Sequence, residues 1–377
     1  MKVLAGLSRW WRGGRVMSTP SQGARDASVT GAAAGGRASE IHLFVLWDRA
    51  RPRADRIVRD IASHFRILDG VELQWTSSLA ARHYTRLYGQ SLPSESRKVR
   101  ECGSGPPLLI VVADDAPHYA ERKRWGRRYT VNARLFDAKA RYRRWAGGSS
   151  VHCTTDLRET EHDLFLLLGL RAADYAQRPP RAWSGTFRPE YRDLTGSTGW
   201  QSLEEVFTAI DLTLGYVALP PVDNGPEIRL LLEGWWPHWG VEWLIADPER
   251  HPEGATTRVY PVVVASREIP VKLQHVGDGH HDVRWQEAML QGRVRGADGA
   301  YVLAPDDAYL EMVHELLRRG GATASAAARL AGLAERGGYP VPDLTDLATV
   351  AFELERHMAR RGYEFSLSRP ANHGAGP

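Results

Sequence analysis

The sequence lacks the features that would cross-link, anchor or strongly charge a protein. Two cysteines, Cys102 and Cys153, occur in 377 residues, which excludes a disulfide framework and leaves no CxxC pair for structural zinc. No apolar run reaches the roughly 20 residues that a membrane-spanning helix needs. The 49 basic and 45 acidic residues nearly cancel, so the net charge does not indicate a nucleic-acid partner. We expect a cytoplasmic protein, because few cysteines and no disulfides are typical of that compartment.

The first 40 residues differ in composition from the rest of the chain. Arg9, Arg12 and Arg15 interrupt the apolar residues at the start, whereas a signal peptide requires an unbroken apolar core. The continuation is rich in glycine, alanine and small polar residues, which cannot build a packed core. We predict a disordered leader over residues 1–40 and a tail over residues 366–377.

Apolar strand-like runs and helical segments alternate in residues 41–170. The run at 41–47 predicts a strand, and the spacing of Ile57, Ile61 and Phe65 predicts an amphipathic helix after it. The same criteria predict further strands at 66–76, 108–112 and 150–153, helices at 77–89, 136–145 and 156–169, and a basic pair of strand edges at 121–132. This order is typical of an α+β domain with a ferredoxin-like, split βαβ layout.

A linker and a second domain are expected to follow. Proline and glycine without apolar periodicity predict a linker at residues 171–200. Ser202 and Glu205 form a capping box that opens an α/β domain over residues 201–365. Its predicted elements are strands at 216–219, 242–246, 259–264, 271–275 and 301–303, a helix at 285–291, and closing helices at 306–319, 323–336 and 344–361.

Several motifs of residues 41–170 resemble those of nucleoside diphosphate kinases. They are the pair His83-Tyr84, the segment Gly103–Pro106 before an apolar strand, and Val151–Thr154 before an acidic helix. The resemblance rests on the order and spacing of these motifs. It implies that His152 occupies the place of the phosphate-carrying histidine of that family.

The chemistry of that family requires a supported nucleophile and several cations. An imidazole is a good nucleophile near neutral pH, and a carboxylate on its second nitrogen fixes its tautomer. The resemblance assigns this carboxylate to Asp163, with Glu161 as second choice. Cations must neutralise the phosphates, and Mg²⁺ would accompany a nucleoside triphosphate if the domain is active. The remaining residues that the resemblance implies at a nucleotide or phosphate site are Tyr84, beside the base, Thr154, in place of a serine, and Arg122, Lys123, Arg124, Lys139, Arg141 and Arg143.

The sequence also departs from the family pattern. Trp47 stands where the opening strand of the family ends in a lysine, Cys153 replaces a glycine, and Thr155 replaces an acidic residue. These departures favour a domain that binds nucleotide or phosphate without turnover over an active phosphotransferase that works through a phosphohistidine at His152. The basic residues could alternatively form only a solvated edge.

Segments 240–247 and 270–282 resemble a nucleotidyltransferase-like module of cell-surface polysaccharide gene clusters. Such modules use three carboxylates to hold two divalent ions. Gly240, Glu242 and Lys272 would occupy those positions here, so a single carboxylate remains and we predict a pseudoenzyme. A neighbouring cluster suggests either a metal site or a hydrogen-bonded turn, and adjacent histidines favour the turn, because they point differently in most backbones. The cluster consists of Asp278, His280, His281 and Asp282.

The sequence therefore predicts a nucleotide- or phosphate-binding protein with a kinase-like first domain and a degenerate second module. Its expected partner is a nucleotide or nucleotide-sugar, and we predict no resident metal site. An active phosphotransferase is the first alternative. A transferase of cell-surface glycan assembly, with both domains contributing to one site, is the second. Oligomerisation stays open.

Overall fold

The computed structural model describes residues 39–124, 127–179, 182–234, 240–250 and 258–367. Most of the predicted leader and the end of the predicted tail lie outside these residues. The chain divides into two compact units. We call Val29–Trp200 with His238–Pro248 the N-terminal unit, and Gln201–Pro237 with Glu249–Pro377 the C-terminal unit. Each unit is described by itself.

A five-stranded sheet forms the centre of the N-terminal unit. Its strands, in the order β6-β1-β3-β2-β7, are β6 (Val151–Cys153), β1 (Glu40–Leu46), β3 (Leu108–Asp114), β2 (Arg66–Gln74) and β7 (Arg188–Tyr191). The first four strands pair antiparallel, and β7 pairs parallel with β2. The pairing of β2 with β3 has a register shift between Ile67 and Asp69.

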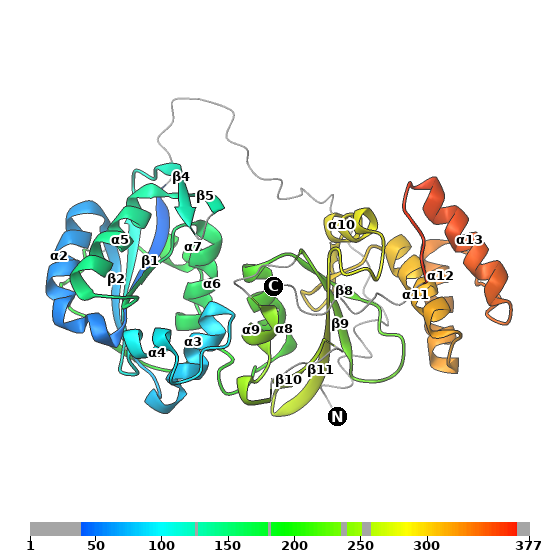
Figure 1. Ribbon diagram of the computed structural model, residues 1–377, viewed down its shortest axis with the longest axis horizontal. Helices are drawn as coiled ribbons and strands as arrows, with labels where there is room; N and C mark the ends of the chain where they lie inside the picture. The colour runs from blue at the N-terminus through cyan, green and yellow to red at the C-terminus, as the bar shows by residue number, and fades with distance from the viewer. Residues whose placement is uncertain (1–38, 125–126, 180–181, 235–239, 251–257, 368–377) are drawn as a thin grey trace. The chain divides into compact units, whose positions relative to one another are not determined.

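Helices cover both faces of this sheet. On one side lie α2 (Ala54–His64) and α5 (Ala133–Ala146), and on the other lie α3 (Ala80–Tyr88), α6 (Leu157–Leu168) and α7 (Ala172–Ala176) (Figure 1). Phe44, Ile57 and Tyr142 belong to the apolar core under α2 and α5. The smaller elements are η1 (Asp48–Arg53), η2 (Ser77–Leu79), α4 (Arg97–Cys102) and a two-stranded hairpin, β4 (Tyr119–Arg124) with β5 (Arg127–Asn132).

The segment expected to be a linker, residues 171–200, contributes to the N-terminal unit. It forms α7, in which Tyr175 is buried, and β7, which extends the sheet. Trp200 at its end is also buried. The four residues of β7 lie at an edge and are largely exposed, so they carry no alternation of apolar and polar residues that would predict a strand.

A six-stranded sheet and flanking helices form the C-terminal unit. The strand order is β10 (Val259–Val264), β11 (Arg267–His275), β9 (Ile228–Leu232), β8 (Tyr216–Leu219), β13 (Tyr301–Val302) and β12 (Val294–Arg295). The helices are α8 (Leu203–Thr213), α10 (Val283–Gln291), α11 (Pro305–Arg319), α12 (Ala324–Gly337) and α13 (Leu347–Arg360). Ser202 is confirmed as the N-cap of α8, because its Oγ accepts the Glu205 N–H at 3.2 Å. The Glu205 carboxylate accepts the N–H of Gln201 at 2.7 Å, not that of Ser202, so the reciprocal bond of a capping box is not formed.

One strand prediction is wrong. Residues 242–246 do not form a strand: 242–245 lie in helix α9 (Val241–Ile245), which belongs to the N-terminal unit, and Ala246 follows it as the C-cap. Val241, Leu244 and Ile245 are buried, whereas Glu242 and Trp243 are half-buried. The buried residues are three and four positions apart, which matches one face of a helix rather than the two-residue alternation of a strand.

Both units combine helices with mixed sheets, in agreement with the α+β class. Within the part of the chain that the structure describes, no helix is long and apolar enough to cross a membrane.

Candidate functional site

The candidate site is built on β6, the short strand at one edge of the N-terminal sheet. The residues on either side of His152, Val151 and Cys153, belong to the apolar core under α5. Because side chains alternate along a strand, His152 points to the opposite face of the sheet. It lies opposite Val45 of β1 in the register, and only 5% of its surface is exposed.

Helix α6 supplies the carboxylates that contact this histidine. Nε2 of His152 lies 2.7 Å from Oδ2 of Asp163, which is 1% exposed, and 3.8 Å from Oε1 of Glu159. Asp156 caps the helix by accepting the Glu159 N–H at 2.8 Å. Glu159 and Asp163 are four residues apart and therefore share one face of α6. The structure thus brings His152 and the predicted Asp163 together.

Burial controls the protonation of the pair. It lowers the pKa of His152 to about 4, although the negative charge of Asp163 opposes the shift. Burial also raises the pKa of Asp163, which the histidine in turn lowers. The histidine is therefore neutral near pH 7. When the carboxylate is ionised it accepts the Nε2–H, so the lone pair lies on Nδ1.

One aromatic ring contacts His152, and the charges of nearby cations act on it. Tyr88 packs edge-on against the imidazole, with ring centroids 5.8 Å apart. The ammonium of Lys98 lies 4.2 Å from the centre of the Tyr88 ring. The positive charges of Lys139 and Lys98 both lower the pKa of His152. Arg143 donates from Nε to the carbonyl of Val151, next to the histidine, at 2.8 Å.

Sequence reasoning missed Lys98. It lies in a polar stretch for which the sequence predicted neither a strand nor a helix. This stretch forms the short helix α4, which Ser96 caps by accepting the Val99 N–H. Burial lowers the pKa of Lys98 to about 8, and the charges of Arg143 and Lys139 contribute. Ser96 was the available signal for a helix start, but nothing in the sequence places α4 beside β6.

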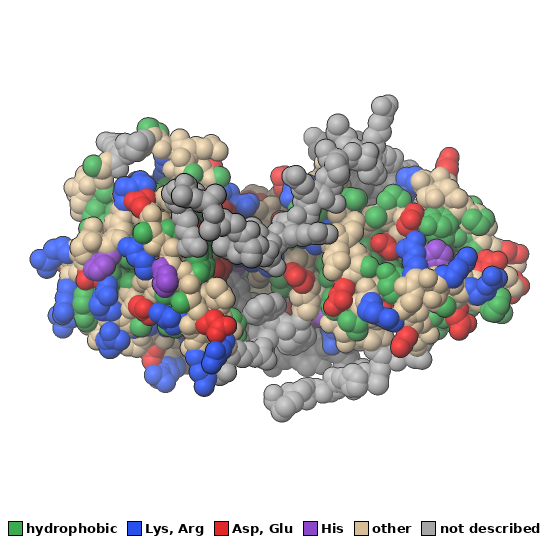
Figure 2. Space-filling model, turned by 90° about the horizontal axis from the view of Figure 1, so that it is seen from above, with side chains coloured by type: hydrophobic (Ala, Val, Ile, Leu, Met, Phe, Trp, Pro, Cys, Tyr) green, Lys and Arg blue, Asp and Glu red, His purple; other side chains and the backbone are tan. Residues whose placement is uncertain are grey.

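Two predicted phosphate ligands are bound to carboxylates of the chain. Arg122 pairs with Asp137 at 3.0 Å, and Arg141 pairs with Asp60 of α2 at 2.6 Å. Neither arginine contacts His152 among the described residues. Figure 2 shows basic side chains spread over the visible face of the N-terminal unit, with carboxylates between some of them.

Tyr84 lies in an aromatic cluster below the surface. It is fully buried, donates from its hydroxyl to the Gly103 carbonyl at 2.8 Å, and packs edge-on against Trp47 and Trp75. Trp47 is also fully buried and stacks on Trp75 with centroids 5.9 Å apart. The residue that follows β1 therefore places an indole, and not a cation, in this aromatic cluster.

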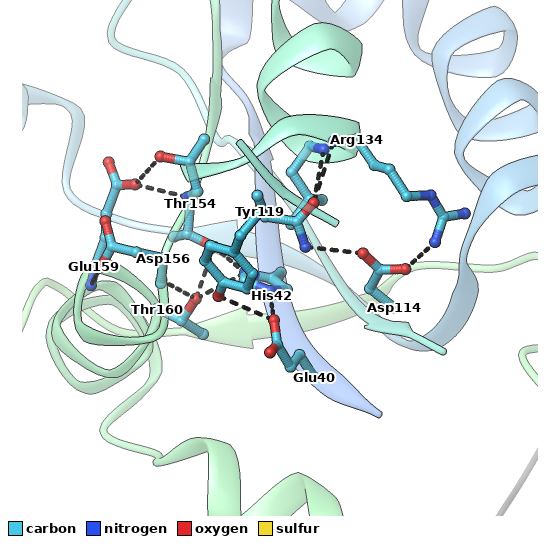
Figure 3. Close-up of polar contacts among 12 residues, drawn as sticks. Glu40, His42, Asp114, Tyr119, Arg134, Thr154, Asp156, Glu159 and Thr160 are labelled. Carbon is cyan, nitrogen blue, oxygen red and sulfur yellow. Dashed lines mark hydrogen bonds and ion pairs between the residues drawn. The ribbon is translucent and has the colours of Figure 1, made fainter. Parts of the chain in front are cut away.

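Thr154 belongs to a separate buried network around His42 (Figure 3). Its Oγ1 accepts the Leu43 N–H at 3.0 Å and the Thr160 hydroxyl at 2.9 Å. Nδ1 of His42 lies 3.2 Å from the Thr160 hydroxyl, and its Nε2 lies 3.4 Å from Glu40. These contacts connect β1, β6 and α6, so Thr154 stabilises the position of the strand that carries His152.

No group of three or more His, Cys, Asp or Glu side chains in the described ranges is arranged to hold a metal ion. The Asp278 cluster forms the hydrogen-bonded turn that the sequence favoured. Asp278 accepts the N–H groups of His275 at 3.2 Å and His280 at 3.0 Å, and Asp282 caps α10.

The sequence matches no model of a known protein family and no curated protein. Function must therefore be argued from the geometry of the site.

Proposed function

We propose that the N-terminal unit binds a nucleotide, a nucleotide-sugar or another phosphate-bearing molecule beside His152. The observation that carries the proposal is that two cations, Lys98 and Lys139, both act on a neutral histidine, while a third, Arg143, binds the carbonyl of the preceding residue, Val151. Their charges act on one another, since Lys139 and Arg143 both lower the pKa of Lys98. Phosphate is an anion that Lys and Arg side chains commonly bind.

Lys98 supplies a cation where the resemblance to nucleoside diphosphate kinases expects one from β1. Trp47 fills the end of β1 with an indole that stacks on Trp75. Lys98 approaches from α4 instead, and its ammonium lies over the ring of Tyr88, which in turn contacts His152. Among the described residues Lys98 makes no ion pair, so its charge is available to a ligand.

The strand arrangement supports the same proposal. The four strands β6-β1-β3-β2 pair antiparallel, with β1 and β3 in the centre. A ferredoxin-like, split βαβ domain has this order. Fold alone does not establish function, so the proposal rests on the residues around His152.

Phosphotransfer through His152 is the second candidate function. Asp163 holds Nε2, and Nδ1 makes no hydrogen bond to a described residue, which leaves Nδ1 as the nucleophile. With 5% of the histidine exposed, a phosphoryl group must enter a nearly closed site to reach this atom. Binding without turnover is therefore the function that the geometry favours.

The second module is proposed to lack nucleotidyl transfer. Glu242 lies on α9 in the N-terminal unit, and Lys272 lies on β11 in the C-terminal unit. A lysine repels the divalent ions that this chemistry uses. No contact in the described residues favours the glycan transferase over the binding protein.

Thermal unfolding with ATP, ADP or inorganic phosphate tests the binding proposal. The wild type is expected to gain stability with at least one of them, since a ligand that binds only the folded state raises the midpoint. Lys139→Met should weaken binding about tenfold or more, because it removes a charge-assisted contact. Arg122→Met, which changes a cation already paired with Asp137, is the matched control and should bind as the wild type does. The proposal fails if none of the three compounds shifts the midpoint, or if Lys139→Met binds as tightly as the control.

The phosphohistidine is tested separately with γ-labelled ATP. The wild type should take up label that acid releases, and His152→Ala should take up none. Wild-type protein that binds ATP but stays unlabelled would exclude phosphotransfer and leave the binding proposal intact.

A further inference from the structure

A buried polar cluster lies in the C-terminal unit between α11 and the sheet. Glu311, Glu315 and Arg318 stand on one face of α11, because spacings of three, four and seven residues share a face. Arg229 of β9 and Lys272 of β11 are register partners on neighbouring parallel strands. Arg229 is 2% exposed, and its guanidinium lies 2.7 Å from Glu311 and 3.5 Å from Glu315.

The carboxylates of this cluster do not balance its cations. Glu315 accepts two hydrogen bonds from Arg318, at 2.7 and 2.9 Å, in addition to its contact with Arg229. Lys272 is half-buried and forms no ion pair or hydrogen bond with a described residue. Burial and the charges of Arg229 and Arg318 lower its pKa. Arg319 also donates to Glu315, at 2.9 Å, so three arginines share this carboxylate, whereas Lys272 pairs with none among the described residues.

Next to Lys272 a glutamine is buried without partners. Gln274 is 1% exposed, and neither its amide nitrogen nor its amide oxygen has a hydrogen-bond partner. It lies two residues along β11 from Lys272, so both side chains leave the same face of the sheet. Its register partner Leu231 belongs to the core that includes residues of α10 and α11. Gln274 therefore points into the layer that contains the charged cluster.

His281 adds two more unpaired atoms to this layer. It is 9% exposed, its ring centroid lies 4.6 Å from that of His314 on α11, and neither ring nitrogen has a partner. Burial lowers its pKa, and the charges of His314 and Arg229 contribute. His314, which it contacts, precedes Glu315 on α11. Buried polar groups in folded proteins almost always have partners, so a missing partner is indicated here. A water molecule could satisfy the amide of Gln274, but it would not neutralise Lys272.

We propose that this cluster is a second anion site, which binds a phosphate group between β11 and α11. Lys272 would supply the charge, and the amide of Gln274 and a ring N–H of His281 would donate to the phosphate oxygens. A tetrahedral dianion matches a site with an unpaired ammonium and several neutral donors. The site is independent of the one at His152, because every residue in it belongs to the C-terminal unit.

Calorimetric titration of the full chain with inorganic phosphate tests this site. The titration is done in a Lys139→Met background, in which the site proposed at His152 is weakened, so that the two proposals fail separately. Added Lys272→Met should weaken the remaining phosphate binding about tenfold or more, whereas Lys272→Arg, which keeps the charge, should stay within about threefold. Arg267→Met changes an exposed cation of the same strand and should leave binding unchanged.

The Lys272→Met substitution is not expected to unfold the protein. Lys272→Met removes a half-buried unpaired charge, so its melting temperature without phosphate should equal or exceed that of its parent. Gln274→Leu provides a second test and should also weaken phosphate binding. The proposal is overturned if the Lys139→Met protein gives no phosphate-dependent heat, or if Lys272→Met binds phosphate as its parent does. Equal binding of acetate would assign the site to carboxylates and also overturn it.

Discussion

Nε2 of His152 and Oδ2 of Asp163 lie 2.7 Å apart, and neither residue exposes more than 5% of its surface. The two residues are brought together by the edge strand β6 and the first turns of α6. A buried imidazole depends on its hydrogen-bonded carboxylate for both orientation and stability. Four predictions follow from this pair and from the charged groups around the two proposed sites.

Asp163→Asn is expected to lower the free energy of unfolding of the N-terminal unit by about 1–3 kcal/mol, because it weakens a buried charge-assisted hydrogen bond. Glu161→Gln is the matched control on the same helix. Its carboxylate pairs with Arg171 at the surface, where such a pair contributes about 0–1 kcal/mol. Urea unfolding measures both variants. A larger loss for Glu161→Gln than for Asp163→Asn would show that the partner of the histidine is misassigned.

Acid should destabilise the N-terminal unit through His152. Burial lowers its pKa from 6.5 to about 4, so between these values the unfolded chain binds a proton that the folded chain does not. Stability therefore falls as the pH drops from about 6.5 towards 4. The raised pKa of Asp163 opposes this loss at the acid end of the window. Melting temperatures measured across this range should fall less steeply for His152→Gln than for the wild type.

The control for this pH series is His118→Gln, since His118 is exposed. Its profile should follow that of the wild type. His83 and His162 also have pKa values lowered to about 4 by burial, so part of the acid sensitivity should persist in His152→Gln. Identical slopes for His152→Gln and the wild type would contradict the assignment.

Phosphate binding at His152 should weaken as the pH rises past the pKa of Lys98. Burial lowers that pKa to about 8, so the ammonium loses its proton between about pH 7 and 9 and with it the charge that attracts the ligand. Lys98→Met should bind ATP about tenfold more weakly at pH 7 and should lose this pH dependence. Arg97→Met, beside it in α4 and paired with Glu101 at the surface, should bind as the wild type does. Calorimetry at several pH values would refute the role of Lys98 if both variants behaved alike.

Arg229→Met is expected to cost about 3–5 kcal/mol of stability in the C-terminal unit, because it leaves the buried Glu311 without its partner. Burial already raises the pKa of Glu311 while Arg229 is present. The control is Arg284→Met, which removes a surface pair with Asp282 and should cost no more than about 1 kcal/mol. Chemical denaturation compares the two variants. A loss of less than about 1 kcal/mol for Arg229→Met would show that Glu311 does not depend on the arginine.

Much of the fold was predictable where local pattern decides structure. The strands at 216–219 and 259–264 have the predicted bounds, since each is a short run of strand-forming residues between polar or turn residues. The strand predicted at 242–246 was wrong, because five residues are too few to distinguish the helical period of apolar residues from the two-residue period of a strand. β9 (Ile228–Leu232) was missed, although all five of its residues are buried.

Local sequence pattern by itself determined most of the elements and the N-cap at Ser202, and the resemblance to nucleoside diphosphate kinases implied Asp163 as the partner of His152. The tertiary structure decided which cations reach that histidine. Lys98 approaches it from a polar stretch, whereas Arg122 and Arg141 pair with the carboxylates of Asp137 and Asp60. The physical reason is that periodicity and capping act over a few residues, whereas ion pairs and burial depend on segments that only the folded chain brings together.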